Sequence, residues 1–321
     1  METQAHFHFA RRTAMVEFRT LGALRLIGTD GREAAGVLAQ PKRLALLAYL
    51  IMARPRGQHR RDTLLALFWP DLSQSHARHA LSQALHFLRR SLSAQLVVTR
   101  GSEEVGVDPT LVRCDALAFD QAVDAGDVEA ASTLYEGDFL AGFFLSDAPE
   151  FERWLDNERS RLRSRAVEVA RTRADLGRAE GKRIDAARWA SRAAALDPLD
   201  ERALRRLMRA HDEAGDRAAA IGAFQAFARR LSQELDAEPS PETLRLAEVI
   251  RARVTPSPLV SADNAPVRLE RLPRERLAGR EKSAPQDTYS RRVAAVGARA
   301  LRSIATWVRR GWSRARAVLA E

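Results

Sequence analysis

The stretch QSHARHALSQALHFLRRSL, residues 74–92, decides how the N-terminal part of this chain folds. Its apolar side chains recur at spacings of three and four residues, which predicts a helix with one buried stripe. The stripe consists of Ala77, Leu81, Ala84, Leu85, Leu88 and Leu92. The other positions hold mostly Gln, His, Arg and Ser, in place of the Glu and Lys mixture of an ordinary solvated face. Such a face is suited to binding something other than water.

The segments on either side of this helix predict a winged helix-turn-helix domain. Upstream, alternating apolar residues at 16–26 and the turn Thr29-Asp30-Gly31 predict short antiparallel strands. A helix follows from Pro41 through KRLALLAYLIMA, and a second helix, RRDTLLALF, is closed by Pro70. Downstream, residues 96–108 place a Gly-Ser-Glu-Glu turn between two apolar runs, which is typical of a β-hairpin. Strands, three helices and a terminal hairpin occur in the order of this fold.

The polar face of residues 74–92 suits a DNA-recognition helix. Long or forked donors can reach base edges in the major groove, while small hydroxyl groups let the backbone approach. The predicted base-reading residues are Ser75, Arg78, His79, Ser82, Gln83 and His86. The predicted phosphate contacts are Lys42, Arg43, Arg60, Arg61, Arg89, Arg90 and Arg100. Arg78 can donate two hydrogen bonds to a guanine, and Gln83 can form hydrogen bonds with the edge of an adenine. These two residues are therefore expected to determine the sequence specificity.

Other interpretations of this helix remain open at the level of sequence. It could be a solvated surface helix, although cations at two other predicted helix starts and at the hairpin base favour a phosphate backbone. Phe87 borders the polar face, where it could pack on the hairpin or touch a thymine methyl group. The histidines at 76, 79 and 86 suggest a zinc site, but no fourth ligand is in view. We therefore predict no metal site and no cofactor.

Charge is distributed unevenly along the 321 residues. Residues 1–100 carry 15 Lys and Arg against 6 Asp and Glu, whereas residues 101–254 carry 23 against 30. Residues 255–321 are basic again, with 14 against 6. This segregation indicates that the N-terminal part meets a polyanion while the middle meets something else. Chance drift in an arginine-rich composition is the alternative.

Composition and motifs exclude several classes of protein. The single cysteine, Cys114, excludes an internal disulfide and a thiolate-rich metal site, which fits a reducing cytoplasm. The sequence has no apolar run of membrane-spanning length and no secretory signal at its start. It also lacks GxSxG, HExxH and GxxxxGK[ST] motifs. We predict a protein that is not an enzyme and that is cytoplasmic and nucleoid-associated.

The acidic middle of the chain is predicted to be almost entirely helical, and one of its predicted helices runs from Val128 through Leu140. The segments GKRIDAARWASRA from Gly181 and GDRAAAIGAFQAF from Gly215 align with an offset of 34 residues. That offset is the period of tetratricopeptide (TPR) repeats, whose stacked helix pairs leave a groove for partners. A weaker third copy begins at Gly126. A generic alanine-rich helical bundle is the alternative.

The expected fold class is multi-domain and mainly α, with an α+β winged helix followed by an all-α TPR-like domain. The predicted divisions are a disordered leader at 1–14, a winged-helix DNA-binding domain at 15–110, a helical domain at 111–254, a flexible linker at 255–285 and a basic amphipathic helix at 286–321. Tryptophan and arginine on that last helix suit an anionic membrane surface. Nucleic-acid contact, a docking helix and the stub of a further domain are the other interpretations, and a solvated or partner-bound helix is favoured over membrane contact.

Several of these segments together resemble the SARP-type bacterial transcriptional regulators. The similarity covers residues 15–253, and its most specific pieces are PKRLALLAYL, the ALxxALxxLRRSL helix and the RRLSQELDAEPSPET segment. The resemblance implies an OmpR/PhoB-like winged helix followed by a bacterial transcriptional activator domain of TPR helices. It also implies promoter DNA, often with direct-repeat sites, as one partner, and RNA polymerase with its sigma factor as another. Dimer formation on direct repeats is a further implication.

The sequence thus predicts a sequence-specific DNA-binding transcriptional regulator. Activation by recruitment of RNA polymerase through the helical-repeat domain is the expected mode of action. The alternative is a TPR-type adaptor whose winged helix binds protein in place of DNA. Loss of sequence preference on Arg78→Ala favours the first function, and recovery of a partner without DNA favours the second.

Overall fold

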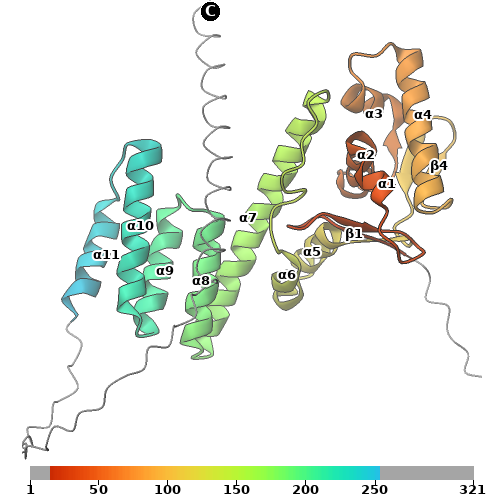
Figure 1. The fold of residues 1–321 in the computed structure, drawn as a ribbon. Helices are drawn as coiled ribbons and strands as arrows, with labels where there is room; N and C mark the ends of the chain where they lie inside the picture. Colours follow the sequence, from red (N-terminus) through yellow and green to blue (C-terminus); the bar gives the residue numbers. More distant parts are fainter. Residues whose placement is uncertain (1–14, 254–321) are drawn as a thin grey trace, which may run out of the picture. The chain divides into compact units, whose positions relative to one another are not determined.

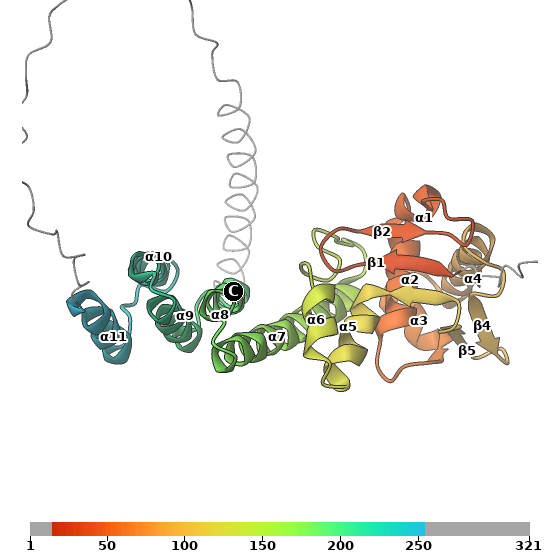
Figure 2. The same ribbon diagram turned by 90° about the horizontal axis from the view of Figure 1, so that it is seen from below.

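A three-stranded sheet begins the part of the chain that the structure, a computed structural model, describes, residues 15–253. Its strands are β1 (Val16–Arg19), β2 (Arg25–Ile27) and β6 (Val112–Cys114). β1 lies in the middle, antiparallel to β2, with Phe18 opposite Leu26, and parallel to β6, with Phe18 opposite Cys114. Figure 2 shows β1 beside β2. The antiparallel pair was predicted; the parallel partner, ninety residues away, was not.

The winged helix-turn-helix elements follow in the predicted order. They are α1 (Ala35–Leu38), α2 (Pro41–Met52), β3 (His59–Arg60), α3 (Arg61–Phe68), α4 (Gln74–Ser91), β4 (Val97–Arg100) and β5 (Glu104–Val107). Pro41 opens α2 at its first turn, where the missing N–H costs nothing. The hairpin β4–β5 gains β3 as a third strand, in the order β3-β5-β4. This arrangement confirms the predicted fold of the N-terminal part, to which the structure adds the short helix α1.

Seven helices complete the described residues (Figure 1). They are α5 (Asp115–Asp124), α6 (Val128–Leu134), α7 (Pro149–Ala179), α8 (Arg183–Leu196), α9 (Glu201–Glu213), α10 (Arg217–Leu235) and α11 (Pro241–Ala252). From α7 onward each helix packs against the next one along the chain. The predicted helix from Val128 through Leu140 was too long: α6 ends at Leu134, and residues 135–148 form a loop in which Leu140 has a φ of 46°.

The turns between helices show why the repeated glycines are spaced as they are. Gly126, Gly181 and Gly215 have φ values of 73°, 74° and 85°, which only glycine adopts without strain. In each turn the residue after the glycine donates its N–H to a carbonyl five residues earlier, and the glycine itself donates to one three residues earlier. This shared pattern is a helix C-cap of the Schellman type. The repeat that begins at Gly126, although weak in sequence, therefore has the same turn as the other two.

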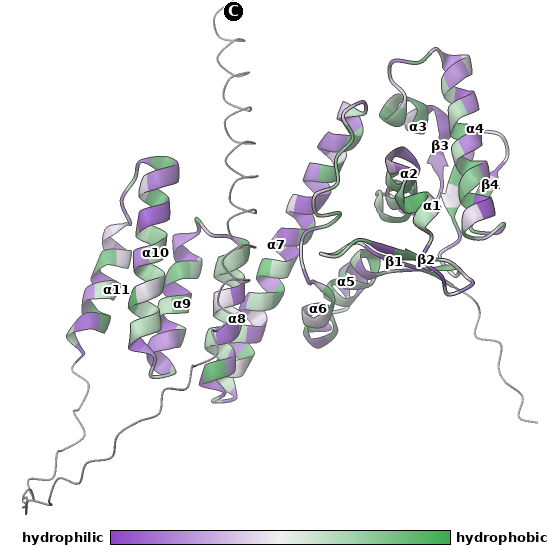
Figure 3. Cartoon of the chain, viewed as in Figure 1, coloured by the Kyte–Doolittle hydropathy of each residue, from purple (hydrophilic) through white to green (hydrophobic). Residues whose placement is uncertain are grey.

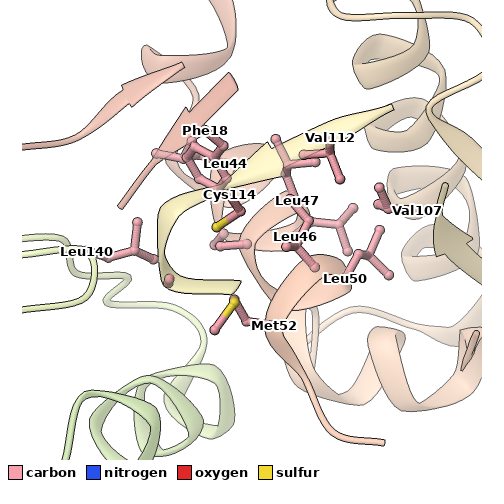
Figure 4. Packing of buried hydrophobic residues seen from close by; sticks show 14 of the residues in the cluster. Phe18, Leu44, Leu46, Leu47, Leu50, Met52, Val107, Val112, Cys114 and Leu140 are labelled. Carbon is pink, nitrogen blue, oxygen red and sulfur yellow. The ribbon is translucent and has the colours of Figure 1, made fainter. Parts of the chain in front are cut away.

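One large hydrophobic cluster runs through the first two thirds of the described residues, from Val16 to Val169. Figure 4 shows part of it, where Phe18 and Cys114 lie near Leu44 and Leu47 of α2. At the start of α7, the ring of Trp154 lies 4.8 Å from that of Tyr49, between centroids. A second cluster joins α9, α10 and α11. The core thus continues across residue 110, while the predicted division of the chain at that point stays a prediction.

Candidate nucleic-acid interface

The outward face of α4 holds all six predicted base-reading residues. Ser75, Arg78, His79, Ser82, Gln83 and His86 are all exposed. The predicted apolar stripe of the same helix is buried, with Leu81, Leu85 and Leu88 each at most 1% exposed. Figure 3 shows this mixture of hydrophilic and hydrophobic residues along α4. Burial of one stripe therefore fixes the direction in which the polar side chains point.

Two contacts organise this face in the free protein. The Gln83 amide donates to Nε2 of His79, one helical turn earlier, at 2.8 Å. Arg78 reaches Asp62 of α3 at 3.8 Å, and both side chains are more than half exposed. Because an exposed ion pair contributes only about 0–1 kcal/mol, Arg78 can exchange Asp62 for a base at little cost. The same holds for the hydrogen bond of Gln83, whose partner is also solvated.

A hollow of about 380 Å³ beside this face brings predicted phosphate contacts and a base reader together. Lys42 and Arg43 line it from the first turn of α2, Gln83 from α4, and Trp69 from the end of α3. The first turn of α2 contains no acidic residue, so the positive end of its helix dipole is not neutralised there. Two cations and the positive end of the helix dipole around one hollow form a suitable site for a phosphate group.

Phe87 has a role that the sequence did not reveal. Its ring lies 4.0 Å from the guanidinium carbon of Arg43, which is a cation–π distance. The ring is half-buried and packs against the main hydrophobic cluster. The aromatic residue at the edge of the polar face thus serves as a platform that holds Arg43 beside α4.

The small sheet β3-β5-β4 brings two further predicted cations together. Arg60 and Arg100 both stand directly opposite Glu104 of the central strand, and directly opposed residues point to the same face. Arg60 and Arg100 are exposed. The carboxylate of Glu104 between them lowers the positive charge of the hairpin. The neighbouring Glu103 accepts the backbone N–H of Arg61 through its carbonyl at 2.8 Å.

The remaining residues predicted to contact phosphate differ in their exposure and in whether they already bind another group. Arg90 is exposed. Arg89 is half-buried and donates from Nε to the carbonyl of Val97 at 3.2 Å, so it joins α4 to the hairpin. Arg61 is half-buried, and its Nε is buried without a hydrogen-bond partner among the described residues. Lys42 pairs with Asp147 at 2.7 Å.

Two of the three histidines on α4, His76 and His79, each share a hydrogen bond with a residue about one helical turn away. His76 shares a hydrogen bond of 2.8 Å between its Nδ1 and the hydroxyl of Ser73. No group of three potential metal ligands from His, Cys, Asp and Glu occurs within residues 15–253. Burial raises the pKa of the Cys114 thiol to about 12, which leaves this cysteine protonated and unreactive.

The most prominent charged cluster of the structure was missed by sequence reasoning. Asp120 of α5 has a fully buried side chain that accepts hydrogen bonds from four arginines. Its partners are Arg54, Arg56, Arg161 and Arg165, at 2.6 to 2.8 Å. The first two follow α2, whereas the other two belong to α7. One carboxylate thus ties the segment after α2 to the two helices that follow the winged helix.

Burial of Asp120 raises the pKa of its carboxyl group, but the hydrogen bonds and charges of Arg161 and Arg54 outweigh this effect. The net result is a pKa below the ordinary value of 3.8. One hint in the sequence could have revealed this site. Asp120 lies four residues after Ala116 and next to Phe119, so an acidic residue falls on the apolar face of a helix. A carboxylate on a buried face needs cationic partners, and its partners are distant in sequence.

None of the described helices is long and apolar enough to cross a lipid bilayer. The predicted leader 1–14, linker 255–285 and basic helix 286–321 lie outside the described residues. The expectations about membrane or nucleic-acid contact by that last segment therefore stay predictions.

Comparison with known proteins finds one matching domain and two regulatory relatives. Residues 110–251 match the bacterial transcriptional activator domain. The regulatory protein AfsR of Streptomyces griseus is 28% identical over 226 residues, which cover 66% of this chain and 22% of AfsR. AfsR of Streptomyces coelicolor is 27% identical over 249 residues, covering 73% and 24%. This chain therefore spans less than a quarter of the length of these relatives.

A solved structure supports the fold. The complex titled "Mycobacterium tuberculosis EmbR in complex with low affinity phosphopeptide" aligns with a TM-score of 0.51 at 21% identity, covering 74% of this chain and 65% of that one. The relatives are regulatory proteins, in agreement with the prediction that the chain is not an enzyme. The matched domain, the regulatory relatives and the shared fold agree with the resemblance read from the sequence. Residues 110–251 are similar to the bacterial transcriptional activator domain, and the chain resembles the SARP-type bacterial transcriptional regulators.

Proposed function

We propose that this chain binds promoter DNA in a sequence-specific manner and activates transcription by recruiting RNA polymerase with its sigma factor. In this mechanism α4 enters the major groove, where Arg78 and Gln83 contact base edges. The hollow lined by Lys42 and Arg43 holds a backbone phosphate, and the hairpin β4–β5 contacts the neighbouring minor-groove phosphates. The helical domain then presents a surface to polymerase or to a second copy on direct repeats. The site of action is the cytoplasmic nucleoid.

The observation that carries this proposal is the exposed polar face of α4 with cations beside it. Arg43 lies beside α4 through its contact with Phe87, and the sheet β3-β5-β4, which Arg89 joins to α4, carries Arg60 and Arg100. A helix in the major groove requires base-reading residues at the centre of its face and phosphate-contacting residues around them. In the free protein Arg78 pairs with Asp62 and Lys42 pairs with Asp147. At least one side chain of each pair is more than half exposed, so both ion pairs are easily exchanged for contacts with DNA.

The experiment that tests this function begins with selection of bound duplexes from a random DNA pool. Fluorescence anisotropy then measures the affinity for the selected duplex and for a scrambled one, over a series of salt concentrations. We expect a clear preference for the selected duplex and a steep loss of affinity with salt, because several phosphates are neutralised and counterions are released. No enrichment over the starting pool, or equal affinity for both duplexes at moderate salt, contradicts the proposal. Partner capture without DNA in that case supports the adaptor function.

The hairpin supplies a separate prediction. We expect Glu104→Gln to increase affinity for every duplex by a similar, several-fold factor, because it removes the negative charge that stands between Arg60 and Arg100. Anisotropy titrations of the selected and the scrambled duplex measure this effect. Glu129→Gln, an exposed change on α6, is the matched control and should leave both affinities unchanged. An unchanged affinity for Glu104→Gln indicates that the hairpin does not approach DNA.

A further inference from the structure

One ion pair joins the proposed phosphate site to the part of the chain that follows the winged helix. Nζ of Lys42, which lines the hollow beside α4, lies 2.7 Å from Oδ2 of Asp147. The two residues are 105 positions apart, and Asp147 falls within residues 110–251, the region similar to the activator domain. A carboxylate and a DNA phosphate both present anionic oxygens to a cation, so Asp147 already makes the kind of contact that DNA needs from Lys42.

Lys42 is held at the hollow by its surroundings. Its side chain is 24% exposed, and Nζ lies 5.7 Å from the centroid of the Trp69 ring, which lines the same hollow. Beside it, Arg43 rests on the ring of Phe87. A phosphate that enters the hollow therefore meets two positioned cations, while the carboxylate of Asp147 opposes their attraction at short range.

The backbone that carries Asp147 is held from its own side as well. Arg159 of α7 donates hydrogen bonds to three carbonyl groups of residues 139–143, at 2.7 to 3.0 Å. Glu152, in the first turn of α7, accepts the backbone N–H of Leu145 at 2.7 Å. The loop before α7 is thus bound to that helix, and the helix presents the carboxylate of Asp147 to the phosphate site.

We propose that Asp147 competes with a DNA phosphate for Lys42, so that the loop before α7 restrains DNA binding in the free protein. This inference rests on the proposed DNA-binding function and adds a regulatory contact to it. Coupling between two contacts is reciprocal. DNA binding therefore weakens the pair of Asp147 with Lys42, and a partner that draws Asp147 away from Lys42 raises the affinity for DNA by the same factor.

The substitution Asp147→Asn in the full chain tests this inference. We expect it to tighten binding to the selected and to the scrambled duplex alike, by about two- to fivefold, because a phosphate contact carries no sequence information and a partly exposed ion pair contributes little. Anisotropy titrations measure both affinities. Glu150→Gln is the matched control, since it removes the same charge three residues away from an exposed side chain whose partner is Arg153 of the same helix. The control should change both affinities much less.

A double-mutant cycle shows whether Asp147 acts through Lys42. Lys42→Met keeps the apolar stem of the side chain and removes its charge, so it should weaken binding to every duplex. In that background Asp147→Asn should have no larger effect than Glu150→Gln. Equal effects of Asp147→Asn and Glu150→Gln in the wild-type background overturn the inference, as does an effect of Asp147→Asn that persists in full beside Lys42→Met. Both results leave DNA binding by the wild type intact, whereas a wild type that binds no duplex contradicts the proposed function and this inference with it.

Discussion

We expect the substitution Asp120→Ala to lower the free energy of unfolding by about 3–5 kcal/mol, the range found when one partner of a buried ion pair is removed. The carboxylate is fully buried and its four arginine partners come from two separate segments. Without it, Arg161 and Arg165, whose side chains are 27% and 20% exposed, keep their charges with only Glu158 and Asp124 as acidic neighbours. Urea denaturation followed by circular dichroism measures the loss.

The matched control is Asp124→Ala on the same helix. Asp124 also pairs with Arg165, but its side chain is 61% exposed, so its removal should cost no more than about 1 kcal/mol. A smaller loss for Asp120→Ala than for Asp124→Ala contradicts the structural role of the buried cluster. Asp120→Asn, which keeps the shape and removes the charge, should be destabilising as well.

The same cluster predicts a dependence of stability on pH. The pKa of Asp120 is lowered in the folded protein, so the folded state binds its proton less readily than the unfolded state does. The stabilisation is therefore complete above the unfolded pKa of about 4 and is lost as the pH falls through the lower folded pKa. Unfolding curves of the wild type between neutral and acidic pH should show this loss. In Asp120→Asn this contribution to the acid dependence should be absent.

The second large effect is expected for DNA recognition. Arg78→Ala should weaken binding to the selected duplex by about 1–3 kcal/mol, while binding to scrambled duplexes changes much less. The reason is that a forked guanidinium contact with guanine is lost only where the correct base is present. Anisotropy titrations against the selected duplex and duplexes with single substituted base pairs measure both the loss and the relaxed preference.

Arg90→Ala is the matched control for that experiment. Arg90 is exposed on the same helix but is assigned to the phosphate backbone, so its removal should weaken all duplexes by a similar factor and reduce the salt dependence. Identical sequence preferences for Arg78→Ala and Arg90→Ala contradict the division of roles on α4. An unchanged affinity in both variants contradicts the placement of this helix in the major groove.

Local patterns predicted much of the N-terminal fold. The apolar stripe of residues 74–92, Pro41 at a helix start and the Gly-Ser-Glu-Glu turn each depend on neighbours within a few residues. For this reason α2, α3, α4 and the hairpin are where the sequence places them. The repeated glycines likewise predicted helix ends, since a positive φ is a property of one residue and its turn.

The helix predicted across residues 135–140 shows where this reasoning fails. Helical spacing continues past Leu134, yet Arg159 of α7 donates to the carbonyls of Phe139 and Leu140, and Leu21 forms a bridge with Phe139. Contacts with distant parts of the chain thus replace the hydrogen bonds that a helix would form. A periodicity reports only which side chains prefer burial, and tertiary contacts can satisfy that preference in a loop.

The sequence by itself determined the order of α2, α3, α4 and the hairpin, the exposed face of α4 and the helical repeat, because each follows from a local pattern or from a fixed offset along the chain. Only the tertiary structure decided the partners of single charged and aromatic side chains. It placed Arg43 on Phe87, Glu104 between two arginines and four arginines on Asp120. Apart from Glu104 and Arg100, which share one hairpin, these pairs join residues that are far apart along the chain, and no local pattern encodes which distant segment will fold against them.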